Sequence, residues 1–257
     1  MSSDPTRGRA AAQRRIAERR AAEAAVRAAE QKRRRTLVGG VVAAVLVVVA
    51  VVAVVLVQTA RTSTAADAAV PSGTAPGSSQ TAFAVGSADA PVTVDLYEDY
   101  QCPNCRDFEA AAGSTLEDLV DAGTVRVEYH GMAFLDSDRN DDYSTRALNA
   151  AAVVASTTGP EALERFHDLL YANQPDEATG SGLTDDQLVS YAEQAGATGD
   201  AVTAGIEDQT YRDWTVTATD QASKDGVTGT PTVFVDGTAL TDLSADGLTA
   251  AVAAAQQ

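Results

Sequence analysis

One run of residues limits what this chain of 257 residues can fold into. Leu37–Val57, "LVGGVVAAVLVVVAVVAVVLV", holds 21 consecutive residues without a charged or strongly polar side chain. A helix rises about 1.5 Å per residue, so this run is long enough to cross the roughly 30 Å hydrocarbon layer of a bilayer. A cleaved signal peptide has a shorter apolar region, of about 7 to 15 residues. We therefore expect a single transmembrane helix at 37–57.

The net charge changes sign across this apolar run. Residues 1–61 carry 12 Lys and Arg against 4 Asp and Glu, a net charge of +8, whereas residues 62–257 carry 7 against 32, a net charge of −25. The basic residues gather directly before the run, in "QKRRR" at 31–35. By the positive-inside rule the N-terminus is cytoplasmic. We expect a single-pass protein of the cell membrane whose acidic part lies outside the cytoplasm, where cysteines can form disulfides.

The segments that flank the run differ in composition. Residues 1–36 alternate Ala with Arg, Glu and Gln, which predicts a solvated basic tail in the cytoplasm. Contact of this tail with anionic lipid headgroups is the alternative. No aromatic residue is interleaved with the basic ones there, so nucleic-acid binding is not expected. Residues 58–82 are rich in Ser, Thr, Gly and Pro, which predicts a flexible linker.

From about Phe83 onward, strand and helix patterns alternate. Short stretches rich in Val predict strands at 91–98, 124–131, 230–237 and 238–240. The spacing of apolar residues predicts helices at 103–122 and 244–255.

Between the second and third strands, residues 137–222 are helical in pattern throughout. Thr184 and Gln187 have the spacing of a capping box at the start of one of these helices. Two halves of a small α/β unit, separated by an all-helical insertion, account for this order best. We expect residues 83–257 to form that α/β domain.

Cys102 and Cys105 are the two cysteines of the chain, and metal binding or a structural disulfide could explain them. A zinc site would need His130 and His167, which are 37 positions apart, whereas structural zinc sites use closely spaced pairs. We expect one histidine at a strand end and the other on a helix face. A disulfide between the two cysteines restricts the unfolded chain by only about 2 kcal/mol, which is little for a purely structural bond.

A redox pair explains the two cysteines better. The first turn of a helix presents free backbone N–H groups and the positive end of the helix dipole, which lower the pKa of a thiol. Pro103 suits the first helical position, because its missing N–H costs nothing there. Cys102 would then exchange with the sulfur of a partner, and Cys105 would resolve the mixed disulfide.

A strand, "CPNC", a helix, a helical insertion and then "GVTGTPTVFVDG" at 226–237 follow one another in this chain. This order resembles the DsbA-like family of thioredoxin-fold protein-disulfide oxidoreductases, over about 83–257. The resemblance implies that Pro231 is a cis proline facing the cysteines and that Thr230 offers backbone groups to an extended substrate peptide. It also implies cysteine-containing exported proteins as substrates and a membrane-bound, quinone-linked reoxidant, with no cofactor and no metal.

Two positions depart from the pattern of the family. A buried acid often lies six positions before the first cysteine and moves protons to and from the resolving thiol, but here that position is Leu96. Side chains alternate along a strand, so Glu98 shares the face of Leu96 and is our substitute for that acid; a solvated carboxylate at a strand end is the alternative. Strongly oxidising relatives have Pro-His between the cysteines, whereas this chain has Pro103 and Asn104. Asn104 brings no positive charge, so the disulfide should be a milder oxidant.

Three functions are compatible with these features. The first is an enzyme that donates the Cys102–Cys105 disulfide to exported polypeptides. The second is an extracytoplasmic reductase or isomerase that uses the same chemistry in reverse. The third is an anchored binding or chaperone module, for which the two cysteines and Pro231 would not be needed.

Overall fold

The computed structural model describes residues 68–178 and 180–257. The predicted basic tail and the predicted transmembrane helix at 37–57 lie outside the described residues. Within the described part of the chain, no helix has both the length and the apolar content needed to cross a bilayer.

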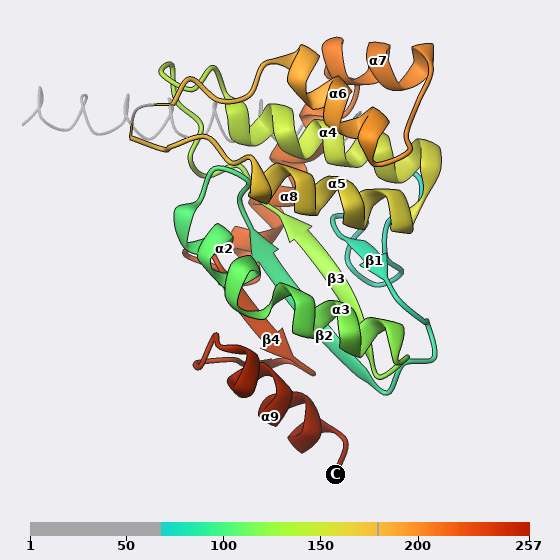
Figure 1. Ribbon diagram of the computed structural model, residues 1–257, viewed down its shortest axis with the longest axis vertical. Coiled ribbons are helices and arrows are strands. Elements are labelled where there is room, and N and C mark those ends of the chain that lie inside the picture. Colours follow the sequence, from blue (N-terminus) through green and yellow to red (C-terminus); the bar gives the residue numbers. More distant parts are fainter. Residues whose placement is uncertain (1–67, 179) are drawn as a thin grey trace, which may run out of the picture. The chain divides into compact units, whose positions relative to one another are not determined.

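A five-stranded mixed sheet forms the centre of the domain (Figure 1). Its strands are β1 (Phe83–Val85), β2 (Val92–Glu98), β3 (Val125–Gly131), β4 (Thr232–Val235) and β5 (Thr238–Ala239), in the order β1-β3-β2-β4-β5. β2 and β3 run parallel, and the other pairs are antiparallel. The parallel pair needs a crossover, which the helical segment after Cys102 supplies.

One face of the sheet is covered by α2 (Pro103–Phe108), the π-helical turn η1 (Glu109–Gly113), α3 (Ser114–Asp121) and α9 (Ala245–Ala255). Leu96 of β2 is fully buried in this layer, together with Phe108, Leu116 and Leu248. The sequence predicts one uninterrupted helix over 103–122, whereas the structure has the π-helical turn in its middle. Such turns are rare and frequently mark functional sites.

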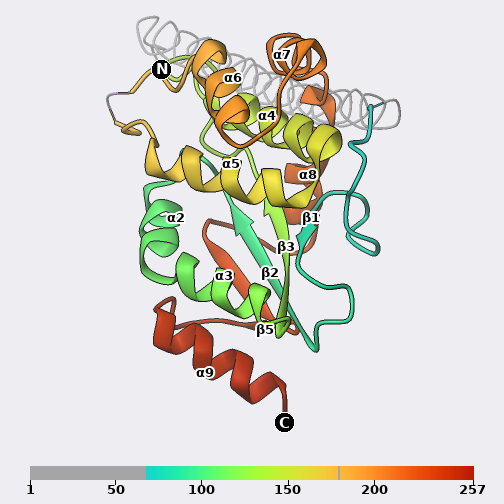
Figure 2. The same ribbon diagram turned by 45° about the vertical axis from the view of Figure 1, so that its right-hand side comes forward.

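The remaining helices form the predicted insertion. They are α4 (Tyr143–Thr158), α5 (Pro160–Ala172), α6 (Asp185–Gln194), α7 (Asp200–Glu207) and α8 (Arg212–Lys224). Figure 2 shows α4 lying between α5 and the α6–α7 pair. The predicted capping box is present: Thr184 accepts a hydrogen bond from the backbone N–H of Gln187, and the Gln187 side chain accepts one from that of Thr184.

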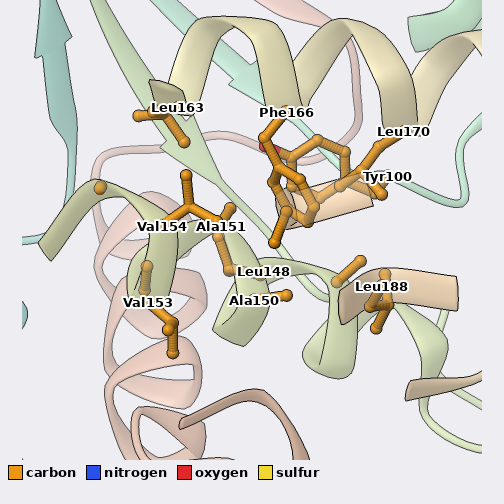
Figure 3. Packing of buried hydrophobic residues seen from close by; sticks show 14 of the residues in the cluster. Tyr100, Leu148, Ala150, Ala151, Val153, Val154, Leu163, Phe166, Leu170 and Leu188 are labelled. Carbon is orange, nitrogen blue, oxygen red and sulfur yellow. The ribbon is translucent and has the colours of Figure 1, made fainter. Parts of the chain in front are cut away.

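The core of the insertion is built around α4, whose residues from Tyr143 to Ala155 are all buried. Many of them are alanines, which let neighbouring helices approach closely. Figure 3 shows Leu148 of α4, Phe166 of α5 and Leu188 of α6 pointing toward this core, with Tyr100 among them. Tyr100 lies between the end of β2 and the cysteines, so the insertion packs directly against the segment that carries them.

The domain begins earlier in the chain than the sequence predicts. Part of the segment expected to be a flexible linker, 58–82, packs on the domain: Ala75 and Ala82 are buried, and Thr74 forms a bridge with Phe83. The indole N–H of Trp214 donates a hydrogen bond to the carbonyl of Gln80 at 2.7 Å. Small side chains are typical of linkers, but here they allow the backbone to lie close against the helices. The prediction also missed β1, whose three residues are too few to show a periodic pattern.

The core of the insertion leads to a stability prediction. Leu188→Ala removes a fully buried side chain and should lower the free energy of unfolding by about 2 to 5 kcal/mol, through lost burial and a new cavity. Glu193→Ala changes an exposed residue of the same helix and is the control. Urea denaturation of the two variants measures both effects. An unchanged midpoint for Leu188→Ala would show that α6 does not belong to the cooperative core.

Candidate active site

Cys102 and Cys105 lie at the start of α2, as predicted. Cys102 is the N-cap residue and Pro103 takes the first helical position. Both cysteines are free thiols in this structure; Cys102 is 5% exposed and Cys105 is fully buried. Asn104, between them, is exposed. The pair therefore has an outer and an inner sulfur.

A buried carboxylate holds the loop that leads into the cysteines. Asp99 accepts hydrogen bonds from the backbone N–H groups of Gln101, Phe134 and Leu135 and from the hydroxyl of Ser144, at 2.6 to 3.1 Å. Burial raises the pKa of this carboxyl to about 6, although these hydrogen bonds oppose the shift. The backbone carbonyl of Asp99 in turn accepts the N–H of Cys102 at 2.8 Å. These bonds fix the position of Cys102 relative to the sheet.

The loop before β4 lies against Cys102. The Thr230–Pro231 peptide bond is cis, as the resemblance implied. The Cys102 thiol donates a hydrogen bond to the carbonyl of Thr230 at 3.4 Å, across 128 residues of sequence. The structure thus brings together Cys102, Cys105, Thr230 and Pro231.

The two thiols have opposite acidities. The pKa of Cys102 is lowered to about 6, mainly because the Cys105 thiol donates a hydrogen bond to its sulfur. Burial opposes this lowering. Hydrogen bonds from the Thr230 side chain and from the backbone N–H groups of Asn104 and Cys105 lower the pKa further. Burial raises the pKa of Cys105 far above its ordinary value, and the neighbouring Cys102 and Glu98 add to the rise. Cys102 is therefore a thiolate near neutral pH, suited to nucleophilic attack, while Cys105 stays protonated until a base removes its proton.

Glu98 is buried beneath the cysteines at the end of β2, with 5% of its surface exposed. The alternative of a solvated carboxylate is therefore wrong. Burial raises its pKa well above the ordinary value, and the charge of Glu109 adds to this effect. Leu96 packs in the core between the sheet and α2–α3, and it also lines a small cavity together with Glu98 and His167.

Two residues that the sequence analysis did not assign to the site lie beside Glu98. His167 of α5 places Nε2 at 3.5 Å from Glu98 Oε2 and at 3.4 Å from Oε1 of Glu109, the first residue of η1. His167 lies on a face of α5, as expected, and that face is buried, because His167 is only 4% exposed. The signal that could have found it is its position on the apolar stripe of α5, next to Phe166 and Leu170.

The other histidine lies on a different part of the sheet. His130 is 3.1 Å from Asp95 and its ring stacks on Tyr97 at a centroid distance of 4.2 Å. Within the described residues, two groups have the spacing of metal ligands, Asp95–Glu128–His130 and Glu98–Glu109–His167. Neither contains a cysteine, so the cysteines and histidines do not converge on one ligand set.

Comparisons with known proteins agree with this geometry. Residues 78–254 match the protein family described as Thioredoxin. The chain belongs to the thioredoxin family, in its DsbA-like group of thiol-disulfide oxidoreductases.

Two solved structures from Mycobacterium tuberculosis are similar to this chain. The reduced disulfide bond oxidoreductase DsbG is 33% identical, with a TM-score of 0.62 over 70% of this chain and 88% of that one. Reduced DsbA is 31% identical, with a TM-score of 0.57 over 68% of this chain and 99% of that one. The serine/threonine-protein kinase PknE of the same organism is 31% identical over 156 residues, 58% of this chain. The chain spans only 28% of the length of that kinase.

The acidity of Cys102 leads to a titration prediction. The rate of its alkylation should follow a midpoint near pH 6 and fall as the pH drops below it, because only the thiolate reacts. Cys105→Ala removes the largest stabilising hydrogen bond and should move the midpoint upward. Iodoacetamide alkylation of the reduced protein across pH measures both. A midpoint at the ordinary thiol value, or one that Cys105→Ala leaves in place, would contradict this assignment.

Proposed function

We propose that this DsbA-like enzyme acts outside the cytoplasm and donates the Cys102–Cys105 disulfide to exported polypeptides through a mixed disulfide. The observation that carries the proposal is the pairing of an acidic outer thiol, held at 3.4 Å from Thr230 O beside the cis proline, with a fully buried inner thiol. A binding or chaperone module would need neither this pairing nor the two acidities.

The proposed reaction proceeds in two exchanges. A substrate thiolate attacks Cys102 Sγ of the disulfide, the Cys102–Cys105 bond breaks, and Cys105 leaves as a thiolate that takes up a proton. A second substrate thiolate then attacks the substrate sulfur of the mixed disulfide, and Cys102 leaves as a thiolate. The lowered pKa of Cys102 makes it a good leaving group in this second step.

The cis-proline loop is the proposed platform for the substrate. Thr230 lies just before β4, and its carbonyl faces Cys102. An extended peptide that pairs with this backbone, as in strand addition, would bring its cysteine to the outer sulfur. Such binding recognises the backbone of the substrate rather than its side chains, which suits an enzyme that accepts many polypeptides.

The direction of electron flow follows from how well the thiolate is stabilised. The lowered pKa of Cys102, about 6, stabilises the thiolate of the reduced form, which favours donation of the disulfide. We infer an oxidase of moderate strength, in agreement with Asn104 taking the place of a histidine. A reductase or isomerase remains the second candidate, and the reduction potential separates the two.

The site of action is proposed from the sequence. The apolar run at 37–57 and the basic residues before it favour a membrane anchor with the enzymatic domain outside the cytoplasm. A membrane-bound, quinone-linked protein would then restore the disulfide of the reduced enzyme. This arrangement keeps the enzyme close to both its reoxidant and newly exported chains.

A trapping experiment tests the proposed mechanism. Full-length Cys105→Ser is first loaded at Cys102 with thionitrobenzoate by reaction with Ellman's reagent. It should exchange this group for the thiol of a reduced polypeptide with one cysteine and keep the mixed disulfide, because the resolving sulfur is missing, whereas Cys102→Ser should form none. Non-reducing gel electrophoresis after acid quenching measures both variants against the unmodified protein. Oxidation of the substrate that survives Cys102→Ser would contradict the mechanism.

A further inference from the structure

Polar groups without hydrogen bonds gather beneath the redox pair. Both carboxylate oxygens of Glu98, Oε1 of Glu109 and Nε2 of His167 are buried, and none has a hydrogen-bond partner of good geometry among the described residues. The side chains of Glu98 and His167 are 6% and 5% exposed. Buried polar groups are nearly always paired, so an unpaired set that converges on one point calls for a functional explanation. We call Glu98, Glu109 and His167 the buried triad.

The triad can be electrically neutral only if it holds exchangeable protons. Two ionised carboxylates beside a neutral imidazole would leave two negative charges in a buried site, which is costly. One proton on the imidazole and one on the carboxylates make the three groups neutral together. Both protons then lie on groups that can pass them on, since Nε2 is within 3.5 Å of an oxygen of each carboxylate.

The groups around His167 allow its proton to move. The hydroxyl of Tyr100 is 3.3 Å from Nδ1 and can donate to a neutral ring or accept from a charged one. The rings of Tyr129 and Tyr171 also contact His167, at centroid distances of 4.7 and 4.9 Å. Burial raises the pKa of all three phenols, so they stay neutral around the triad.

Two further carboxylates of α5 belong to these surroundings. Glu164 and Asp168 lie one turn before and one residue after His167, and burial raises the pKa of each. The charge of His167 opposes that rise in both. Neither carboxylate is a member of the triad.

The two ends of the triad have different surroundings. Glu98 is close enough to the redox pair for its charge to raise the pKa of Cys105. Together with His167 it lines a cavity of about 20 Å³, which has room for about one water molecule. Glu109 is 14% exposed and lines a cleft of about 420 Å³ between η1, α3 and α5. The triad thus connects the neighbourhood of the inner sulfur with solvent.

The backbone makes room for the outer member. Glu109 begins the π-helical turn, and Gly113 ends it. A Cβ atom on Gly113 would lie 2.6 Å from Oε2 of Glu109, so only glycine leaves the carboxylate its present position. The π-helical turn and the glycine together place Glu109 against His167.

We propose that His167 and Glu109 carry protons between Glu98, beside Cys105, and the cleft between η1, α3 and α5. The proposal rests on the proposed function, because a proton must reach or leave Cys105 in each exchange. When Cys105 leaves as a thiolate, Glu98 gives it a proton and regains one from the cleft through Glu109 and His167. When the Cys105 thiol attacks a mixed disulfide on Cys102, the proton passes to Glu98 and leaves by the same route, while the electrons move between the sulfurs.

One reagent resolves the two sulfur steps. The reduced full-length protein attacks Ellman's reagent through Cys102 and releases one thionitrobenzoate; Cys105 then attacks the adduct and releases a second. The first phase is bimolecular and reports on the Cys102 thiolate, whereas the second is unimolecular and requires deprotonation of Cys105. Stopped-flow absorbance follows both phases across pH, in water and in heavy water.

Glu109→Gln and His167→Gln should slow the second phase by about tenfold, less than the roughly hundredfold or more of a group that transfers the proton directly. They should also change its pH profile and its solvent isotope effect, and leave the first phase unchanged. Gly113→Ala should give a smaller loss of the same kind, because it only displaces Glu109. Glu117→Gln removes an exposed carboxylate of α3 that lines the same cleft outside the triad, and it is the matched control.

The outcomes separate this proposal from the proposed function. If the unmodified protein shows no second phase, the enzymatic mechanism itself fails. If the unmodified protein shows a second phase, and Glu109→Gln and His167→Gln show the same rate, pH profile and isotope effect for that phase, only the proton route is overturned. A divalent metal ion bound to the purified protein in one-to-one ratio and lost in Glu109→Gln would also overturn it, because the same donors would then be metal ligands. Near-ultraviolet circular dichroism verifies that each variant is folded. If His167→Gln unfolds, Glu109→Gln still tests the proposal, because Glu109 is partly exposed.

Discussion

The contact between Cys102 and the loop before β4 depends on one pairing in the sheet. β2 and β4 are antiparallel neighbours, and Tyr97 lies opposite Thr232. This register places the end of β2, which leads into the cysteines, next to the beginning of β4, which follows Pro231. The hydrogen bond from Cys102 to Thr230, the access of a substrate to the outer sulfur and the burial of the inner one all follow from it. The long helical insertion can lie between the two halves because the sheet joins them again.

The asymmetry between the two thiols has a simple physical origin. Cys102 lies at the N-terminus of α2, where hydrogen-bond donors face its sulfur, whereas Cys105 lies one turn inward, where burial opposes a charge. An enzyme of this kind needs both properties. The outer sulfur must form a thiolate easily, and the inner sulfur must be shielded from other reactants by burial. The cost is that the inner sulfur needs a route for its proton. The buried triad provides such a route in our account, and its unpaired polar groups are explained by it.

Local patterns predicted much of the fold and the centre of the site. The valine-rich strands agree with the structure to within one residue at 91–98 and 124–131, and the capping box at Thr184 is present. The cysteine pair with its helix-starting proline was also predictable, because it is contained in a few neighbouring residues. The cis form of the Thr230–Pro231 bond followed from the family resemblance.

Features that depend on long-range packing were not predictable in the same way. Glu109 and His167 are 58 positions apart and meet only because α5 packs near η1. No local sequence pattern assigns a structural role to Asp99, yet it anchors a buried loop through four hydrogen bonds. The segment from residue 68 to Ala82 has the composition of a linker and is nevertheless packed on the domain, with Ala75 and Ala82 buried.

The reduction potential of the Cys102/Cys105 pair in the full-length protein tests the central claim most directly. Equilibration with glutathione buffers and quantification of the free thiols would measure it. A stabilised but not extreme thiolate predicts a value between the roughly −120 mV of DsbA and the roughly −270 mV of thioredoxin. A value at or below that of thioredoxin would contradict the account, because the disulfide would then be too stable to be donated.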